Sequence, residues 1–322
     1  MCKVSVIMSV YNAEKYLSQA VESIVRQVFE DFEFIIIDDC STDKSYEIIR
    51  HYVDVDKRIK VLRKQENKGS KGFVENLNWG LKEAKGQYVA RMDADDISHP
   101  ERLEKQVQFL DAYSDVFMVG SSINFIDEKD NFIKVLEAPE RDEAIKQKMP
   151  KSISMYHPVI MFRNNAEVRY RDKIYYCEDY DLYLRLMIEG KKFYNFTTPL
   201  LDYRILETSI SRKDGKFFRT LFVEKTKQFY RESLKYGKDS YEEFHPEYLL
   251  HILDSEKNES EKELKFALNV ATKHRYKKEL SILMNQYKSQ YGNKIDVILL
   301  NIMNSFPMVI PKFYYKFLKK SF

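Results

Sequence analysis

The sequence predicts an α/β protein: a mixed, mostly parallel sheet flanked by helices, with a helical C-terminal extension. Three observations support this prediction. Short apolar, β-branched runs alternate with stretches of helical periodicity over the first 112 residues. Polar and acidic turns follow several of these runs. From Phe217 onward helical periods dominate, and neither Gly nor Pro occurs between Pro246 and Gly292.

The first part of the chain contains four predicted strands, each followed by a polar turn. These strands cover residues 4–10, 34–37, 58–63 and 87–92. The helices predicted between and after them cover residues 16–25, 46–52, 72–84 and 101–112. Asn12 belongs to the residue types that cap helices, so we expect it to cap the first helix. Repeated strand–helix units predict parallel strands whose carboxyl ends share one edge of the sheet.

After residue 112 the pattern changes. Residues 116–125 and 132–136 are rich in β-forming side chains and flank residues 127–131, whose composition is typical of a hairpin turn. This region therefore predicts a mixed edge of the sheet. A further helix is predicted over residues 180–188. The predicted division of the chain is residues 1–215 as one domain with halves 1–112 and 113–215, and residues 216–322 as a helical region.

Charge and cysteine content narrow the class of protein. The 322 residues contain 53 Lys+Arg and 50 Asp+Glu, and a net charge of +3 does not indicate a nucleic-acid-binding protein. The three cysteines fit neither a disulfide framework nor a zinc site, which favours a reducing compartment. The first apolar run is too short for a signal peptide, and no run of 18 apolar residues occurs. We therefore expect a cytoplasmic protein.

Acidic residues cluster directly after two predicted strands. Asp38 and Asp39 follow the second strand, and Asp93, Asp95 and Asp96 follow the fourth. Ligands of open parallel sheets bind beyond the carboxyl ends of the strands. Each cluster taken alone is more often a helix cap, but the two together favour a divalent cation that bridges a nucleotide diphosphate. The chain has no GxGxxG or GxxxxGK[ST] pattern, which argues against dinucleotide and P-loop sites.

Several ordered stretches of the sequence carry a resemblance to a known family. They are VSVIMSVYN (4–12), IIDDCSTD (36–43), NKG (67–69), AKGQYVARMDADD (84–96), PERL (100–103), HP (157–158), CEDYDLYLRL (177–186) and YR (203–204). Together they closely resemble the family 2 glycosyltransferases of the type that builds bacterial surface polysaccharides. The nucleotide-binding domain of that family has the Rossmann-like GT-A fold, and the resemblance covers about residues 3–212.

The resemblance implies roles for individual residues. Asp39 would accept a hydrogen bond from the nucleotide base, and Asp179 would be the catalytic general base. Asp95 would ligate Mn²⁺ or Mg²⁺ directly, and Asp93 would face the metal or the ribose. The other residues expected to contact the donor are Ser9, Val10, Tyr11 (stacking on the base), Glu14, Lys71 (towards the diphosphate) and Ala94.

The implied reaction transfers a hexose, with inversion, from a UDP-hexose or UDP-HexNAc to a hydroxyl of a glycan or polyprenyl-linked acceptor. One carboxylate takes the proton of the attacking hydroxyl, and the metal stabilises the departing diphosphate. Two other functions stay open. One is a catalytically silent protein that binds nucleotide-sugars or acts as a scaffold. The other is a sugar nucleotidyltransferase, although the Gly-rich basic loop it needs is absent from residues 9–15.

Some residues keep two interpretations. His157 either orients the acceptor or is a structural histidine, and Asp181 is either functional or structural. We expect Cys177 to be a buried small hydrophobe rather than a nucleophile. Leu206 stands where the family often carries a histidine, which leaves a metal or phosphate contact from that loop open.

The last 29 residues have a distinctive composition. Residues 294–322 contain five Lys and one Asp among aromatic and aliphatic side chains. This composition suits a helix lying on an anionic membrane surface, which would place the protein at the inner face of the cell membrane. The equal alternative is packing against the catalytic domain or against a second subunit, as in a homo-oligomer. Pro307 and Pro311 interrupt any long amphipathic helix here.

Overall fold

The computed structural model describes residues 2–206, 215–254 and 260–292, which belong to two compact units. Among the described residues, the first unit comprises residues 2–206 and 226–242, and the second comprises residues 215–225, 243–254 and 260–292. Helix α7 (Lys216–Tyr236) contributes to both. The division expected at residue 215 stays a prediction, and no sequence pattern assigned residues 226–242 to the first unit.

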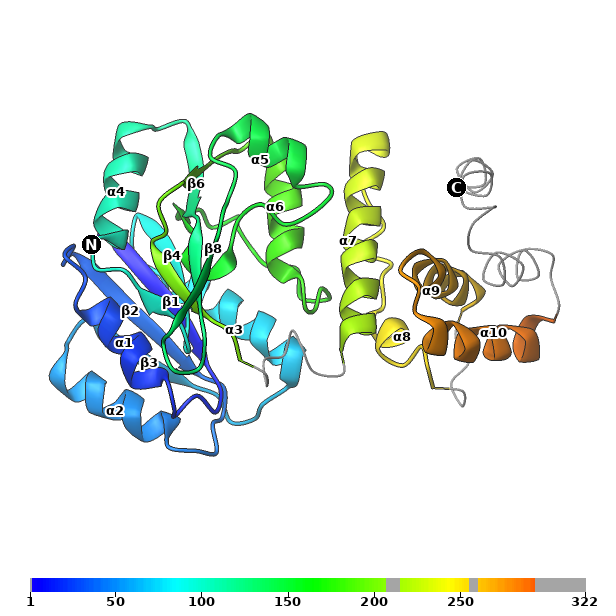
Figure 1. The fold of residues 1–322 in the computed structure, drawn as a ribbon, viewed down its shortest axis with the longest axis horizontal. Helices are drawn as coiled ribbons and strands as arrows, with labels where there is room; N and C mark the ends of the chain where they lie inside the picture. Colours follow the sequence, from blue (N-terminus) through cyan, green and yellow to red (C-terminus); the bar gives the residue numbers. More distant parts are fainter. Residues whose placement is uncertain (1, 207–214, 255–259, 293–322) are drawn as a thin grey trace. The chain divides into compact units, whose positions relative to one another are not determined.

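A seven-stranded sheet forms the centre of the first unit, in the order β10-β6-β9-β4-β1-β2-β3 (Figure 1). Strand β9 is antiparallel to both of its neighbours, and all the other pairs are parallel. The predicted mostly parallel sheet is confirmed. Its strands are β1 (Val4–Val10), β2 (Phe32–Asp38), β3 (Ile59–Arg63), β4 (Tyr88–Asp93), β6 (Val116–Ser121), β9 (Met161–Arg163) and β10 (Lys192–Phe196).

Helices cover both faces of this sheet, because alternate side chains of each buried strand point to opposite sides. Val6 and Met8 of β1 belong to the core that includes the first helix, α1 (Leu17–Val25). Ile7 points to the other side and faces Gly80 of the third helix, α3 (Gly69–Glu83). Figure 1 shows the helices of the two layers. One layer contains α1, α2 (Ser45–Val55) and α4 (Arg102–Ala112), and the other contains α3 and α6 (Glu178–Ile188).

The region predicted as a mixed sheet edge divides between two sheets. Residues 116–121 form β6 in the large sheet, and the Ser122 backbone N–H still donates to the Phe196 carbonyl of β10 at 2.8 Å. The chain then enters a second sheet at Ile123. This four-stranded sheet has the order β5-β11-β7-β8. The predicted hairpin is confirmed, because β7 and β8, on either side of the turn, pair antiparallel. The strands are β5 (Ile97–Ser98), β7 (Ile123–Ile126), β8 (Phe132–Leu136) and β11 (Leu201–Arg204).

Short elements complete the first unit. They are helix α5 (Asp142–Lys148), the 3₁₀ turn η1 (His157–Val159) and strands β5, β9, β10 and β11. No helical or strand period is recognisable for them in the sequence, since two to seven residues are too few to establish one.

The described part of the second unit is helical, as predicted. Besides the first part of α7 it contains α8 (Pro246–Leu250), α9 (Glu261–Lys273) and α10 (Lys277–Tyr291). A buried ion pair joins Lys225 to Glu263, with Nζ 2.9 Å from Oε2. Among the described residues, no helix has the length and apolarity needed to cross a membrane. The segment expected to bind a membrane or a subunit, residues 294–322, lies outside the described residues.

Candidate active site

The carboxyl ends of strands β1, β2 and β4 meet at one edge of the large sheet. In the parallel pairing with β2, Val10 is opposite Asp38, and in the pairing with β4, Ser9 is opposite Asp93. The residues that follow these strands are therefore close in space. This is the edge at which open α/β sheets bind their ligands, and it brings together the two acidic clusters that the sequence singled out.

Protein contacts on both sides hold Asp39 in place. Its backbone N–H donates to the Val10 carbonyl at 2.8 Å, which continues the pairing of β1 and β2 by one residue. Lys64 Nζ lies 3.1 Å from Oδ1, and Asn67 Nδ2 donates to Oδ2 at 2.9 Å. Asp39 is almost fully buried. A carboxylate with these contacts has a fixed orientation and keeps free lone pairs for a ligand donor.

The loop after β1 is built differently from the prediction. Asn12 does not cap the first helix, which starts after Tyr16. Asn12 instead has φ 47° and accepts a hydrogen bond from the Thr42 backbone N–H at 2.8 Å, so it joins the loops after β1 and β2. Glu14 also joins these two loops, because its carboxylate accepts a hydrogen bond from the Lys44 backbone N–H at 2.9 Å. An Asn side chain can bond to any nearby backbone amide, and here the neighbouring loop supplies it.

The other residues expected to contact the donor differ in exposure. Tyr11 is 49% exposed, so its ring is accessible for stacking, whereas Val10 is fully buried. Ser9 Oγ accepts a hydrogen bond from Asn76 of α3 at 3.0 Å. Lys71 lies exposed in the first turn of α3. Their contacts with a donor stay a prediction.

The carboxylates at the end of β4 and directly after it lie close together, and two of them have raised pKa values. Arg91 Nη2 lies 2.6 Å from Oδ1 of Asp93. Burial, followed by the neighbouring Asp93 carboxylate, raises the pKa of Asp95 to about 6. Asp96 is buried, and its pKa is raised by burial and by both other acids. Its Oδ1 accepts from the Arg204 backbone N–H at 2.9 Å, but its buried Oδ2 has no hydrogen-bond partner. Ala94 is also nearly buried.

These features fit a divalent cation. Carboxylates crowded together, with raised pKa values and one unsatisfied buried oxygen, are stabilised when a cation joins them. Within residues 2–206, 215–254 and 260–292, no three His, Cys, Asp or Glu side chains already form a metal-ligating group. Mg²⁺ and similar ions are commonly bound by one or two carboxylates, with water and substrate phosphates completing the shell. Asp93 and Asp95 can supply those carboxylates.

Arg204 connects the acidic segment after β4 to helix α1 and to the turn between β7 and β8. Its fully buried guanidinium donates from Nε to the Asp95 carbonyl at 2.8 Å and from Nη2 to Gln19 of α1 at 2.8 Å. It also bonds to the Asp127 carbonyl and to the Asp130 carboxylate in the β7–β8 turn. The sequence marked Arg204 only as part of a motif, because its partners lie 74 to 185 positions away.

The first turn of helix α6 presents two adjacent carboxylates. Asp179 Oδ1 accepts from the backbone N–H of Tyr180 at 2.7 Å. Glu178 is buried, and burial together with the neighbouring Asp179 raises the pKa of Glu178 to about 8. The Asp93 carboxylate raises it further, whereas the Arg91 charge lowers it. Glu178 therefore carries a proton at neutral pH, and the carboxylates of Asp93 at the end of β4 and of Asp179 in α6 both raise its pKa.

The structure also shows the surroundings of the residues that kept two interpretations. His157 is buried, and its Nε2 lies 2.8 Å from the Tyr170 hydroxyl, which matches a structural histidine. Burial, aided by the Arg91 charge, holds the pKa of His157 well below its usual value, so the ring is neutral. Asp181 is buried between Arg171 and Arg185, which gives it a structural role. Cys177 is a buried thiol whose pKa burial raises, as expected of a non-nucleophile.

Comparison with known proteins agrees with this geometry. Residues 5–170, more than half of the chain, match the model of the family described as Glycosyl transferase family 2. The chain belongs to this family. It is therefore a glycosyltransferase, and the implied fold and enzyme class are confirmed.

Relatives of this glycosyltransferase occur in bacteria and archaea. It is 36% identical over 219 residues to the O-antigen biosynthesis glycosyltransferase WbnJ of Escherichia coli, covering 65% of this chain and 82% of that one. It is 37% identical over 208 residues to an uncharacterized glycosyltransferase of Methanocaldococcus jannaschii, covering 63% and 70%. Among solved structures, residues 1–349 of S. aureus TarS in complex with UDP share its fold. The TM-score is 0.59 at 17% identity, over 94% of this chain and 90% of that chain.

Proposed function

We propose that this glycosyltransferase is a metal-dependent, inverting enzyme that transfers a hexose from a UDP-sugar to a hydroxyl of a glycan or lipid-linked acceptor. The observation that carries the proposal is the meeting of Asp39 and the Asp93–Asp95 pair at the carboxyl edge of β1, β2 and β4. WbnJ, named for O-antigen biosynthesis, and the TarS complexes with UDP and UDP-GlcNAc support a UDP-sugar and a surface polysaccharide.

In this proposal the loops after β1 and β2 hold the nucleotide. Asp39, fixed by Lys64 and Asn67, accepts a hydrogen bond from the base, and the exposed Tyr11 ring stacks on it. Aromatic stacking orients a base without reading its identity, so the carboxylate supplies the selectivity. Glu14 supports the nucleotide site indirectly: its carboxylate accepts a hydrogen bond from the Lys44 backbone N–H and so holds the loops after β1 and β2 together.

Asp179 takes the proton of the attacking acceptor hydroxyl. Its neighbour Glu178 has a pKa raised to about 8 and holds its own proton at neutral pH, so it does not compete as a base. A single base is what an inverting displacement requires, because the hydroxyl attacks from the face opposite the departing diphosphate. Mn²⁺ or Mg²⁺, held by Asp93 and Asp95, would neutralise the charge of that diphosphate.

A thermal-shift screen combined with UDP-release measurements tests the proposal. UDP-glucose, UDP-galactose, UDP-GlcNAc and UDP-GalNAc are compared with GDP-mannose, with Mn²⁺ and with EDTA. We expect a UDP-sugar to raise the melting temperature only with Mn²⁺, and to release UDP. The absence of any metal-dependent response to the five donors would contradict the proposal. Binding without UDP release would favour the catalytically silent alternative.

Two variants separate binding from chemistry. Asp179→Asn keeps the donor-induced thermal shift and loses UDP release, because it removes the base and leaves the donor contacts in place. Asp95→Asn loses the Mn²⁺-dependent part of the thermal shift. An Asp179→Asn enzyme with wild-type turnover would show that another group is the base.

A further inference from the structure

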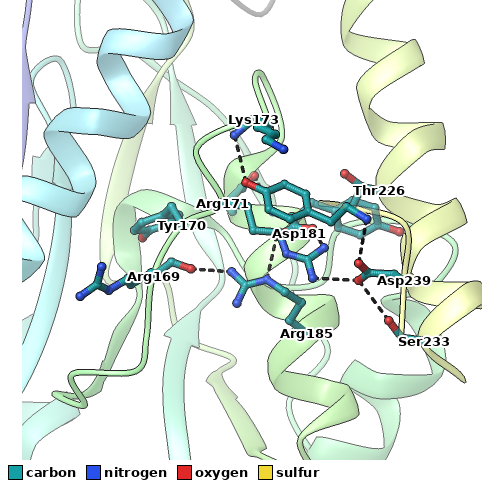
Figure 2. Close-up of polar contacts among 12 residues, drawn as sticks. Arg169, Tyr170, Arg171, Lys173, Asp181, Arg185, Thr226, Ser233 and Asp239 are labelled. Atoms are coloured by element: carbon teal, nitrogen blue, oxygen red, sulfur yellow. Dashed lines mark hydrogen bonds and ion pairs between the residues drawn. The ribbon is translucent and has the colours of Figure 1, made fainter. Parts of the chain in front are cut away.

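A buried group of polar side chains joins helix α6 to the segment that follows helix α7 (Figure 2). Arg171 lies at its centre: its Nη2 is 2.8 Å from Asp239 Oδ2, and its Nη1 is 3.6 Å from Asp181 Oδ1. Arg185 binds the other oxygen of Asp181 at 2.8 Å. Side-chain exposure is 20% for Arg171, 9% for Asp239 and 3% for Asp181, so these charges are little screened by solvent.

The residues around Asp239 strengthen this connection. Its Oδ1 accepts from the backbone N–H of Tyr241 at 3.0 Å, which fixes the turn after α7. The Tyr241 ring then lies 4.3 Å from the Arg171 guanidinium carbon, within the range of a cation–π interaction. The Tyr241 hydroxyl accepts from the Lys173 backbone N–H at 3.2 Å. One short segment, residues 239–241, therefore holds the loop that contains Arg171 through charge, ring and backbone contacts.

A second contact reaches the start of α6 directly. Thr226 Oγ1 of α7 lies 3.6 Å from Sγ of Cys177, and both residues are buried. Cys177 is the N-cap residue of α6, so the proposed base Asp179 is two positions away. Tyr176, just before the cap, has φ +66°, a conformation that non-glycine residues keep only where their surroundings enforce it. The turn that presents the two carboxylates therefore depends on its neighbours for its shape.

We propose that residues 226–242 position the catalytic base, with Asp239 acting through Arg171 and Thr226 acting through Cys177. The inference rests on the proposed role of Asp179. Asp239 and Thr226 are positioning residues, since they act on the backbone and side chains around the first turn of α6 rather than on the donor. The match to the family model ends at residue 170, so this role belongs to a part of the chain beyond that match.

The charge arrangement explains why Asp239 matters. Asp181 accepts from Arg185 and lies 3.6 Å from Arg171, whereas Asp239 supplies the closer carboxylate of Arg171, at 2.8 Å. Without Asp239, Arg171 moves towards Asp181 and competes with Arg185 in the first turn of α6. Displacement of a catalytic group by about 1 Å costs on the order of 100-fold in rate. The proposed donor-binding residues lie at the ends of β1, β2 and β4, in the loops after them and in the first turn of α3, so donor affinity is expected to stay unchanged.

The experiment compares Asp239→Asn and Thr226→Val with Asp239→Glu and the exposed control Asp115→Asn, all in the full chain. UDP-GlcNAc with Mn²⁺ is the first donor, replaced by the best donor of the screen above. We expect kcat for UDP release to fall 10- to 100-fold in Asp239→Asn and several-fold in Thr226→Val, with the donor Kd within twofold of wild type. Asp239→Glu recovers most of the lost rate, and Asp115→Asn matches wild type.

Hydrogen exchange supplies a readout that needs no turnover. Asp239→Asn is expected to speed amide exchange in a peptide covering residues 169–181 and to leave β1 and β4 unchanged. Unchanged exchange there, an unchanged kcat, or a loss of donor affinity equal to the loss of kcat would each overturn the inference. Asp179→Asn measured in parallel separates the two proposals: if it is inactive while Asp239→Asn is fully active, only the positioning role fails. If Asp179→Asn is active, the proposed base fails.

Discussion

Arg91 and Asp93 lie two positions apart on β4, on the same face of the strand, and Arg91 Nη2 approaches Asp93 Oδ1 at 2.6 Å. The guanidinium is almost fully buried, and it also bonds to the Met92 carbonyl. Arg91 thus supplies a fixed, buried positive charge close to several carboxylates, of which Asp93 is its direct partner. Its charge also lowers the pKa values of Asp95, Asp96 and Glu178, which burial and neighbouring carboxylates raise.

Arg91→Lys is expected to weaken Mn²⁺-dependent donor binding about 10-fold, because groups that orient a metal ligand typically contribute 10- to 100-fold to metal affinity. A lysine keeps the charge but cannot bond to Asp93 and the Met92 carbonyl in the same fork geometry. Titration of the donor-induced thermal shift with Mn²⁺ measures the change. The control is Arg26→Lys, in an exposed pair with Glu22. Equal Mn²⁺ affinities for Arg91→Lys and wild type would show that Asp93 needs no such support.

Glu178→Gln is expected to stabilise the fold in a pH-dependent way. The pKa of Glu178 is raised to about 8 in the folded protein, so the protonated form is favoured on folding. Its contribution to stability is complete below the unfolded pKa, near 4.5, and is lost as pH rises to about 8. The variant, which cannot ionise, should match wild type at pH 4.5 and exceed it by roughly 2–4 kcal/mol at pH 8 to 9.

Urea unfolding at several pH values, with EDTA present, measures this difference in the free energy of unfolding. Glu83→Gln, on the exposed surface of α3, is the matched control. A difference between Glu178→Gln and wild type that is the same at every pH would mean that Glu178 is not held protonated by burial.

The sequence was sufficient to predict the parts of the fold that depend on local patterns. The buried runs before Asp38 and Asp93 are short and largely apolar, and the segments between them have helical periods, so parallel β1, β2 and β4 follow directly. Parallel pairing then requires the acids after those strands to share one edge. The position of the candidate site was therefore predictable from local sequence alone.

The contacts that hold the site together were not predictable in this way. Arg204 pairs with Asp130 and Gln19, and Arg171 pairs with Asp239, across 68 to 185 positions of sequence. A charged residue gives the same local signal whether its partner is water or a distant carboxylate. Asn12 shows the same limit: it has a typical capping side chain, yet tertiary packing brought the Thr42 amide closer than the helix.

Arg204→Met is expected to lower the free energy of unfolding by about 3–4 kcal/mol, because removal of one partner of a buried charged group leaves the others unsatisfied. The side chain is fully buried, although Asp130 is 51% exposed, which places the cost towards the lower end of the usual range. Denaturant unfolding measures the loss. Lys192→Met, in an exposed pair with Asp115, should show no measurable change. A loss no larger than that of the control would mean that Arg204 contributes little to stability.

Gly80→Ala tests how closely α3 approaches the sheet. In a helix interior the change normally stabilises by about 1 kcal/mol, since glycine is the weaker helix former. Here an added Cβ would lie 2.5 Å from Cγ2 of Ile7, inside the closest distance that such atoms adopt, and 3.3 Å from Cδ1 of Ile37. Overpacking of a buried contact costs about 1–3 kcal/mol, so the net effect reverses sign and the variant is destabilised.

Thermal and urea unfolding measure the change, with the exposed Lys82→Ala in the same helix as control. A stabilised Gly80→Ala would show that the helix can move away from β1 without penalty.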